Sequence, residues 1–313
     1  MSEFTMRWKK LGHVFNHKQK QDWIENSALT PTPFLINAHV IRVYCGFRDK
    51  YGVSRIGYVD VSAQDPTQVL GVSSSPVLDI GDNGCFDDNG VIMGDIVRVD
   101  NNTVRMYYIG FQLVKKAKFL AYTGLAESHD GGETFRRVKK SPVLDRSDNG
   151  LTINAIHTVI KENGKWKAWY AAGCGWEIIE GKQYPRYNIR YTESDDGIKF
   201  NIDTIDKLCV DVINDEYRIG RPSVYYMEGR YLMFYTKGGR SGKDYFPGVA
   251  FSCDGVEWIR EDDKLGLSLS NDGFDSKHLC YPRLVDVKGK IYCFYNGNNM
   301  GVDGFGVAEL IND

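Results

Sequence analysis

The chain has 313 residues, and its 39 Lys and Arg against 41 Asp and Glu give a net charge of −2, with both signs mixed along the sequence. No basic block indicates nucleic-acid binding, and no run of about 18 apolar residues indicates a membrane-spanning helix. The segment Met1–Lys20 is polar and lacks the apolar stretch of a signal peptide, so we expect a cytoplasmic protein. The seven cysteines include no C-x-x-C pair, so a structural zinc site is not expected. No cofactor is expected, and His157 is the one residue considered for a contact with a channel water or metal.

In chain order, Met6–Phe15 alternates like a strand but precedes the first repeat. An aromatic strand then recurs at intervals of 60 to 65 residues, marked by aligned tyrosines. These tyrosines are Tyr44, Tyr108, Tyr170, Tyr235 and Tyr295. Such a long, regular interval is typical of repeat architectures in which each unit packs on the next.

The clearest repeat is Glu216–Asp262, which predicts four short strands separated by turns such as Asp254-Gly255. One such unit cannot bury both of its faces. Five copies therefore predict an all-β fold, a five-bladed β-propeller of four-stranded antiparallel blades, with residues 1–313 as a single domain. The last copy lacks a fourth strand. We expect Met6–Phe15 to supply it and so to close the ring.

Carboxylates gather just before three of the expected inner strands. Asp88, Glu216 and Asp275 are the candidate catalytic residues, because two carboxylates across one ligand can divide into an acid and a base or nucleophile. The alternatives are structural. Asp88 fits an Asp-Asp-Asn-Gly turn, and Glu216 could form an internal ion pair with a nearby arginine, Arg218 or Arg221.

Basic and aromatic residues near the same segments are candidate ligand-binding residues. Arg221 offers a planar guanidinium that suits a carboxylate or phosphate, and His157 or His278 could contact the ligand, with His278 also able to move a proton. Trp176 and Tyr187, on a long insertion, either stack on a sugar ring or pack in the core. The remaining candidates, each with a loop-closing or turn role as the alternative, are Arg48, Asp49, Arg55, Asp95, Tyr281, Asn296 and Asn298.

With its aromatic second strands, the repeat pattern resembles the five-bladed propeller glycosidases that include arabinanases, β-xylosidases, invertases, levansucrases and mannoside phosphorylases. Several segments more specifically resemble bacterial propeller proteins described as glycosidase-like and associated with surface-polysaccharide or glycan biosynthesis. Those segments are RDKYGVSRIGY (48–58), GCFDDNGV (84–91), YYIGF (107–111), RYNIRYTESDDGIKF (186–200), YRIGRPSV (217–224), FDSKHLCYP (274–282) and YNGNNMGVDGFGVA (295–308).

The resemblance implies acidic residues around the channel, most commonly an Asp directly before Pro. This chain has Thr32-Pro33, Arg221-Pro222 and Tyr281-Pro282 at the matching positions, so the acids of the family do not carry over. We expect a carbohydrate-active, glycoside hydrolase-like protein that cleaves or transfers a glycosidic bond on an intracellular glycan or activated sugar. The alternative is a non-catalytic sugar-binding or scaffold propeller in a glycan biosynthesis complex. The ligand would be a carbohydrate or nucleotide sugar, and an acidic one if Arg221 faces the channel.

Overall fold

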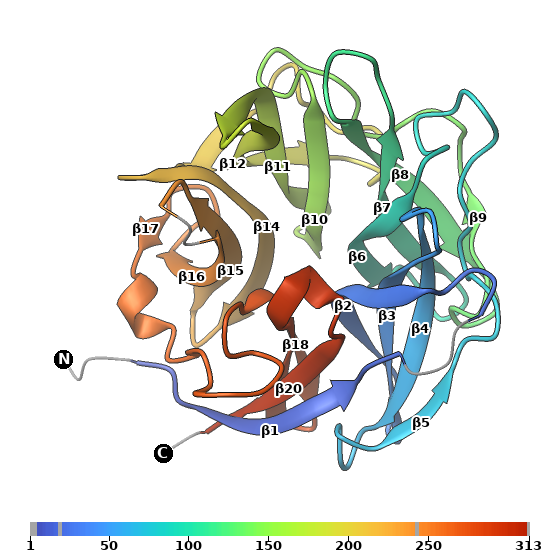
Figure 1. The fold of residues 1–313 in the computed structure, drawn as a ribbon, viewed down its shortest axis with the longest axis vertical. Helices are drawn as coiled ribbons and strands as arrows, with labels where there is room; N and C mark the ends of the chain where they lie inside the picture. The colour runs from blue at the N-terminus through green and yellow to red at the C-terminus, as the bar shows by residue number, and fades with distance from the viewer. Residues whose placement is uncertain (1–4, 18–20, 242–243, 312–313) are drawn as a thin grey trace.

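The computed structural model describes residues 5–17, 21–241 and 244–311. The fold is a nearly all-β propeller, with strands arranged around a central axis (Figure 1). The helical elements of the described part are two short 3-10 segments, Asp262–Lys264 and Asn298–Gly301. Nowhere in these ranges does a helix reach the length and apolar character needed to cross a membrane.

The strands fall into sets by their distance from the axis (Figure 1). The innermost strands are β2 (Asn26–Asn37), β6 (Val91–Arg98), β10 (Ile153–Glu162), β14 (Glu216–Met227) and β18 (Cys280–Val287). The second strands are β3 (Val40–Arg48), β7 (Val104–Gln112), β11 (Lys165–Ile179), β15 (Arg230–Gly239) and β19 (Lys290–Asn296). The third strands are β4 (Ser54–Ser62), β8 (Leu120–Ser128), β12 (Lys182–Ser194), β16 (Asp244–Ser252) and β20 (Phe305–Leu310). The outer strands are β5 (Val69–Val72), β9 (Arg136–Arg137), β13 (Lys207–Val210), β17 (Ile259–Arg260) and β1 (Trp8–Phe15).

Within each blade the inner strand pairs antiparallel with the second, the second with the third, and the third with the outer strand. The strand β1 pairs antiparallel with β20, with Trp8 opposite Leu310 and Phe15 opposite Phe305, so it lies in one sheet with β18 and β19. Short parallel contacts between β8 and β10, and between β12 and β14, connect neighbouring blades. An early and a late segment of the chain therefore share one sheet.

The hydrophobic core lies between neighbouring blades. The second strands are buried on both faces, which explains why they read as continuous apolar and aromatic runs rather than as alternating ones. One core cluster, for example, combines Tyr44 of β3 and Ile56 of β4 with Val91 of β6 and Met106 of β7. Each blade thus buries its faces against the next, as the repeats predict.

Polar side chains of the second strands also bind turns of the following blade. The Tyr44 hydroxyl donates to the Gly132 carbonyl, the Tyr107 hydroxyl to Gly197, and the Trp169 indole N–H to Gly255, each at 2.7 Å. The three acceptors lie in the Ser-x-Asp turns that connect third and outer strands. These turns are therefore contact points between blades.

Every inner strand is interrupted at the same depth by a β-bulge. The register shifts between Leu29 and Thr32, Met93 and Asp95, Ile156 and Thr158, Gly220 and Ser223, and Cys280 and Arg283. A bulge leaves a residue without a partner in the ladder and redirects its side chain, and bulges are common beside functional sites. The residues released from pairing in this way include Thr30, Gly94, His157, Arg221 and Tyr281.

Candidate functional site

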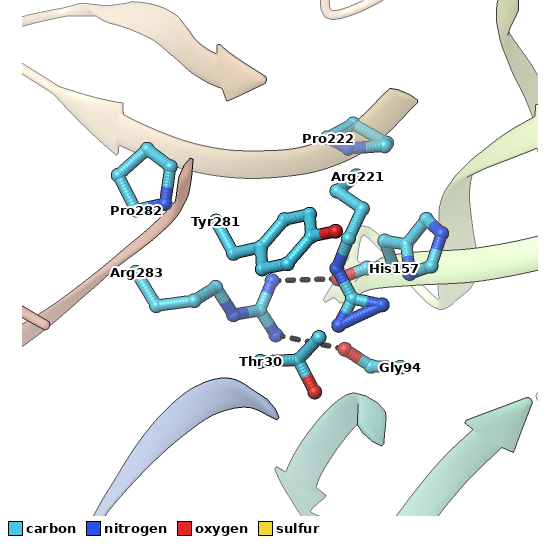
Figure 2. A pocket seen from close by; sticks show the side chains of 8 residues that line it. All are labelled: Thr30, Gly94, His157, Arg221, Pro222, Tyr281, Pro282 and Arg283. Atoms are coloured by element: carbon cyan, nitrogen blue, oxygen red, sulfur yellow. Dashed lines mark hydrogen bonds between the residues drawn. The ribbon is translucent and has the colours of Figure 1, made fainter. Parts of the chain in front are cut away.

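The bulge residues surround a narrow cavity on the propeller axis. Thr30, Gly94, His157, Arg221 and Tyr281 line it, together with Pro222, Pro282 and Arg283 (Figure 2). Its volume of about 10 Å³ is close to the space that one water molecule needs. Segments far apart in the sequence therefore meet at one point because each inner strand bulges there.

Three of these bulges share an unusual backbone. Thr30, Arg221 and Tyr281 each precede a proline and have φ angles of 55°, 56° and 59°. Left-handed backbone is uncommon for residues with a Cβ, and strained residues of this kind cluster at functional sites. The dipeptide of the first blade that corresponds to Arg221-Pro222 and Tyr281-Pro282 is thus Thr30-Pro31. The expectation that Thr32 occupies this position is wrong, because Thr32 is back in the ladder opposite Tyr44.

A larger cavity of about 570 Å³ shares Thr30, His157, Arg221 and Tyr281 with the narrow one, within the range of ~300–1,000 Å³ typical of ligand pockets. Its basic lining residues are Arg48, Arg218, Arg221 and Lys118, joined by the histidines His157 and His278. No Asp or Glu is among its lining residues in the described part of the chain. The cavity is therefore a cationic site rather than an acidic one.

Arg221 lies where the two cavities meet. Its guanidinium donates a hydrogen bond of 2.8 Å to the Met93 carbonyl and lies 5.0 Å from the centre of the Tyr281 ring. Within the described residues no carboxylate lies within ion-pairing distance of it. Desolvation by the surrounding protein, reinforced by the nearby Arg283 charge, lowers the pKa of Arg221 to about 10. A cation held this way is suited to an anionic ligand.

Arg218 lies on the same strand and is also buried. Its guanidinium lies 4.4 Å from the centre of the Tyr245 ring, 4.9 Å from Tyr217 and 5.8 Å from Tyr184. Aromatic faces hold a guanidinium by cation–π attraction and restrict its movement. The three tyrosine rings therefore hold the Arg218 guanidinium in place at this side of the cavity.

Several buried polar atoms in the cavity lining have no hydrogen-bond partner among the described residues. They are the Thr30 Oγ1, the Ser54 Oγ and the His157 Nδ1. Burial, together with the charges of Arg221 and Arg283, lowers the pKa of His157 well below its usual range, so this imidazole is neutral at pH 7. Buried polar groups nearly always have partners. We therefore expect water or a ligand to supply them here.

An ion pair between inner strands borders the narrow cavity. Arg283 pairs with Asp95 and donates to the carbonyls of His157, at 2.6 Å, and Gly94, at 3.3 Å (Figure 2 draws the two carbonyl bonds). Asp95 in turn accepts from the backbone N–H groups of Ile96 and Val159. The predicted ligand contact Asp95 is thus engaged in connecting β6, β10 and β18.

The structure brings six of the predicted binding residues to the larger cavity. They are Arg48, His157, Tyr187, Arg221, His278 and Tyr281. The three predicted catalytic carboxylates, Asp88, Glu216 and Asp275, are not among the residues that line either cavity.

Each of these carboxylates has another partner. Asp88 accepts a hydrogen bond of 2.9 Å from the Gly84 N–H within its turn. Glu216 accepts two hydrogen bonds of 2.9 Å from Arg260 of β17 and lies 3.6 Å from Lys237. The alternative in which Glu216 neutralises Arg221 is therefore wrong: its guanidinium partner is Arg260.

Asp275 belongs to a contact that recurs around the ring. Its carboxylate accepts from the Tyr295 hydroxyl at 3.0 Å and pairs with Lys10 of β1 at 2.6 Å. The same set of tyrosine, aspartate and cation appears as Tyr108–Asp87–Arg137, Tyr170–Asp206–Arg190 and Tyr235–Asp262–Lys237. A contact that repeats in several blades fits a structural role, because a catalytic residue is needed only once.

The pairing of Glu216 predicts a loss of stability in acid. Burial opposes ionisation, but the hydrogen bonds from Arg260 and from the Ile213 N–H hold the pKa of Glu216 below its ordinary value. A carboxyl with a lowered pKa stabilises the fold above its unfolded pKa of about 4.3, and this contribution is lost as the pH falls through the folded pKa. Glu216→Gln should lower the free energy of unfolding by about 1–3 kcal/mol at pH 7. At pH 3 the same substitution should lower the free energy of unfolding much less.

Urea unfolding of the two proteins at both pH values measures this effect. Glu257→Gln, a change at an exposed glutamate, serves as the matched control. An equal difference between Glu216→Gln and the wild type at pH 7 and pH 3 would contradict the ion-pair explanation.

The remaining predicted residues support the site without lining it. Asp49 pairs with Arg55 at 2.8 Å and accepts from the backbone N–H groups of Tyr51 and Val53, so this pair closes a loop. Trp176 packs edge-on against Phe119, a cavity residue, with ring centres 5.2 Å apart.

Two asparagines position cavity residues. Asn296 accepts from the Thr30 N–H at 2.7 Å, and Asn298 accepts from the His278 N–H at 3.0 Å. Both are buried and also donate to backbone carbonyls. They are therefore positioning residues rather than ligand contacts.

Sequence reasoning missed several cavity residues: Thr30, Ser54, Phe119, Tyr184 and Tyr245. Thr30 carries a signal that could have found it, the X-Pro dipeptide at an inner strand. Tyr184 lies on the same insertion as Trp176 and Tyr187. In the sequence, Ser54, Phe119 and Tyr245 cannot be told from ordinary strand residues.

The propeller fold is similar to that of solved glycoside hydrolases. One solved structure, called "Glycoside hydrolase", has a TM-score of 0.72 at 16% identity and covers 99% of this chain and 93% of its own. A thermostable family-43 glycoside hydrolase has a TM-score of 0.67 at 17% identity, covering 94% of this chain and 91% of its own. At such identities the likeness shows the fold alone.

Curated proteins show the family. "Uncharacterized protein Rv1502" of Mycobacterium tuberculosis strain H37Rv is 32% identical over 308 residues, which cover 98% of this chain and 100% of that protein. "Uncharacterized protein MT1551" of strain CDC 1551 matches to the same extent. The chain belongs to the family of these mycobacterial proteins. No protein-family model matches the sequence.

Proposed function

We propose that the axial cavity binds a carbohydrate that carries a phosphate or carboxylate group. The observation that carries this proposal is Arg221, which lines the cavity and has no carboxylate within ion-pairing distance among the described residues, with Arg48 also in the lining. The unpartnered Thr30 and Ser54 hydroxyls add groups that suit sugar hydroxyls. The glycoside hydrolase-like fold supports a carbohydrate rather than another anion.

Binding is better supported than two-carboxylate cleavage. Glycoside cleavage needs two carboxyl groups about 5–10 Å apart across the sugar. Asp88, Glu216 and Asp275 lie outside the lining and have other partners. Cleavage or transfer, a cytoplasmic location and a place in glycan biosynthesis stay predictions. The proposal also takes the chain as a single domain of five blades closed by β1, which the strand pairings support.

A panel of matched ligands tests the proposal. Isothermal titration with a hexose 1-phosphate and a hexuronic acid should give at least tenfold tighter binding than the uncharged hexose, because each anion gains charge-assisted hydrogen bonds. Added salt should weaken binding of the anionic ligands only. Equal affinity for charged and uncharged sugars would overturn the proposal.

The same panel separates binding from cleavage. Release of sugar from an anionic disaccharide by the wild type, abolished in Asp88→Asn, would favour a hydrolase. Binding without release would favour the non-catalytic alternative.

A further inference from the structure

The larger cavity has two chemically different sides. The strand β14 and the segments around β18 and the end of β3 contribute Arg221, Arg218, His278 and Arg48. The strands β6, β7 and β8 of one blade and β10 of the next (Figure 1), with the residues next to them, contribute a largely apolar wall, beside which Asn89, Lys118 and His157 also line the cavity. This apolar wall consists of Ile92, Ile109, Phe111, Phe119, Ala121, Ile153 and Ala155.

The apolar wall is a packed surface. Ile109, Ala121, Ile153 and Ala155 are each at most 5% exposed and belong to one hydrophobic cluster. The rings of Phe111 and Phe119 meet edge to face at 5.2 Å, and Trp176 packs against Phe119. Aliphatic and phenyl side chains offer no hydrogen bond to sugar hydroxyls or to the edges of a nucleobase. Covering the partly exposed wall residues, Ile92, Phe111 and Phe119, with hydrocarbon is favourable in proportion to the apolar area removed from water.

The wall continues to the mouth of the cavity. Leu113, in the loop between β7 and β8, lines the cavity and is still 61% exposed. Val114 follows it at 37% exposure, and then come Lys115, Lys116 and Lys118. The apolar strip thus runs from the interior to solvent and is flanked by positive charge where it leaves the cavity.

We propose that the natural ligand is an anionic carbohydrate joined to a hydrocarbon chain. This inference rests on the proposed function and names its ligand class. The anionic group lies at Arg221, while the hydrocarbon chain lies along the apolar wall and leaves past Leu113. A nucleotide sugar fits less well, since none of the seven wall residues can hydrogen-bond to the edges of the base.

The length of the ligand's hydrocarbon chain is the variable that tests the inference. Titration compares a hexose 1-phosphate with its ethyl, butyl and octyl phosphodiesters, with neutral octyl glucoside as the uncharged control. Affinity should rise up to about fourfold for each methylene that the wall covers and then level off. Leu113→Ser and Phe119→Ala should each weaken binding of the octyl compound at least fivefold more than binding of the chain-free phosphate.

Two design features keep the result interpretable. Leu70→Ser, at an exposed leucine of β5, is the matched control and should change nothing. Leu113 is exposed, so its serine variant folds even if Phe119→Ala does not. Vesicles of phosphatidylcholine with an anionic glycolipid distinguish the source of the ligand: co-sedimentation supports a bilayer source, and binding of the octyl compound without co-sedimentation supports a soluble one.

The outcomes separate this inference from the proposed function. Binding of the hexose phosphate with no effect of chain length would overturn the inference and leave the proposed function intact. Tighter binding of nucleotide sugars than of the octyl compound would also overturn it. If no anionic carbohydrate binds, with or without a chain, the proposed function itself fails.

Discussion

Arg221→Ala should abolish most of the affinity for anionic carbohydrates and leave the fold intact. Removing one partner of a desolvated charge pair costs about 2–5 kcal/mol, which corresponds to a loss of ~30-fold or more in affinity. Stability should change by less than about 1 kcal/mol, because Arg221 has a backbone carbonyl but no carboxylate as its partner in the described part of the protein. Titration and thermal unfolding of the same variant measure the two effects.

The control is Arg136→Ala, at an exposed arginine of β9. Arg221→Lys keeps the charge and loses the planar fork, so it should recover part of the affinity. A large drop in melting temperature with unchanged affinity for Arg221→Ala would show that the residue serves the fold and would refute its role in binding.

Removing residues 1–15 should prevent stable folding of the whole protein. The deletion takes away β1, leaves β20 as an unpaired edge, and removes Met6 and Phe15 from two core clusters. It also leaves the buried Asp275 without Lys10. Each lost core side chain costs about 2–5 kcal/mol, and the total approaches the ~5–15 kcal/mol by which a typical domain is stable.

Circular dichroism and urea unfolding of the truncated chain measure this effect. Removing only residues 1–4, which lie outside the described residues, is the control. A milder variant, Trp8→Ala, should lower stability by about 3–5 kcal/mol, since Trp8 also donates to the Leu265 carbonyl at 2.9 Å. A truncated chain that unfolds like the full one would show that β1 does not close the ring.

The sequence predicts the fold class well because the evidence for it is local and repeated. The aromatic strands around Tyr108, Tyr170 and Tyr235 and the Asp-Gly turns after them depend only on neighbouring residues. Repetition then turns individually weak signals into one architecture. The structure places those strands as second strands, paired as the repeats require.

The candidate site is only partly predictable, because the partner of a carboxylate comes from a distant segment. Nothing in the neighbourhood of Asp275 shows that Lys10, 265 residues away, neutralises it. Glu216 likewise has Arg218 and Arg221 nearby in the sequence but pairs with Arg260. Basic residues near the inner strands were the better guide, since Arg221 and His278 do line the cavity.

The apolar wall could not be predicted at all. Ile109, Ile153 and Ala155 have the same residue types as the core, and only the three-dimensional arrangement shows that one side of them borders a cavity. The polar residues of the ligand site can therefore be predicted from the sequence, and its apolar residues cannot.

The bulges in the inner strands also bear on how such a protein diverges. A bulge side chain such as His157 or Arg221 makes no ladder hydrogen bond, so exchanging it leaves the strand pairing in place, whereas a Cβ at Gly94 would lie 2.3 Å from the Ile156 carbonyl oxygen. The blades have kept similar second strands, yet their bulges carry Thr30, Gly94, His157, Arg221 and Tyr281, each a different residue type. Descendants of this chain could acquire a new ligand by exchanging a few axial side chains.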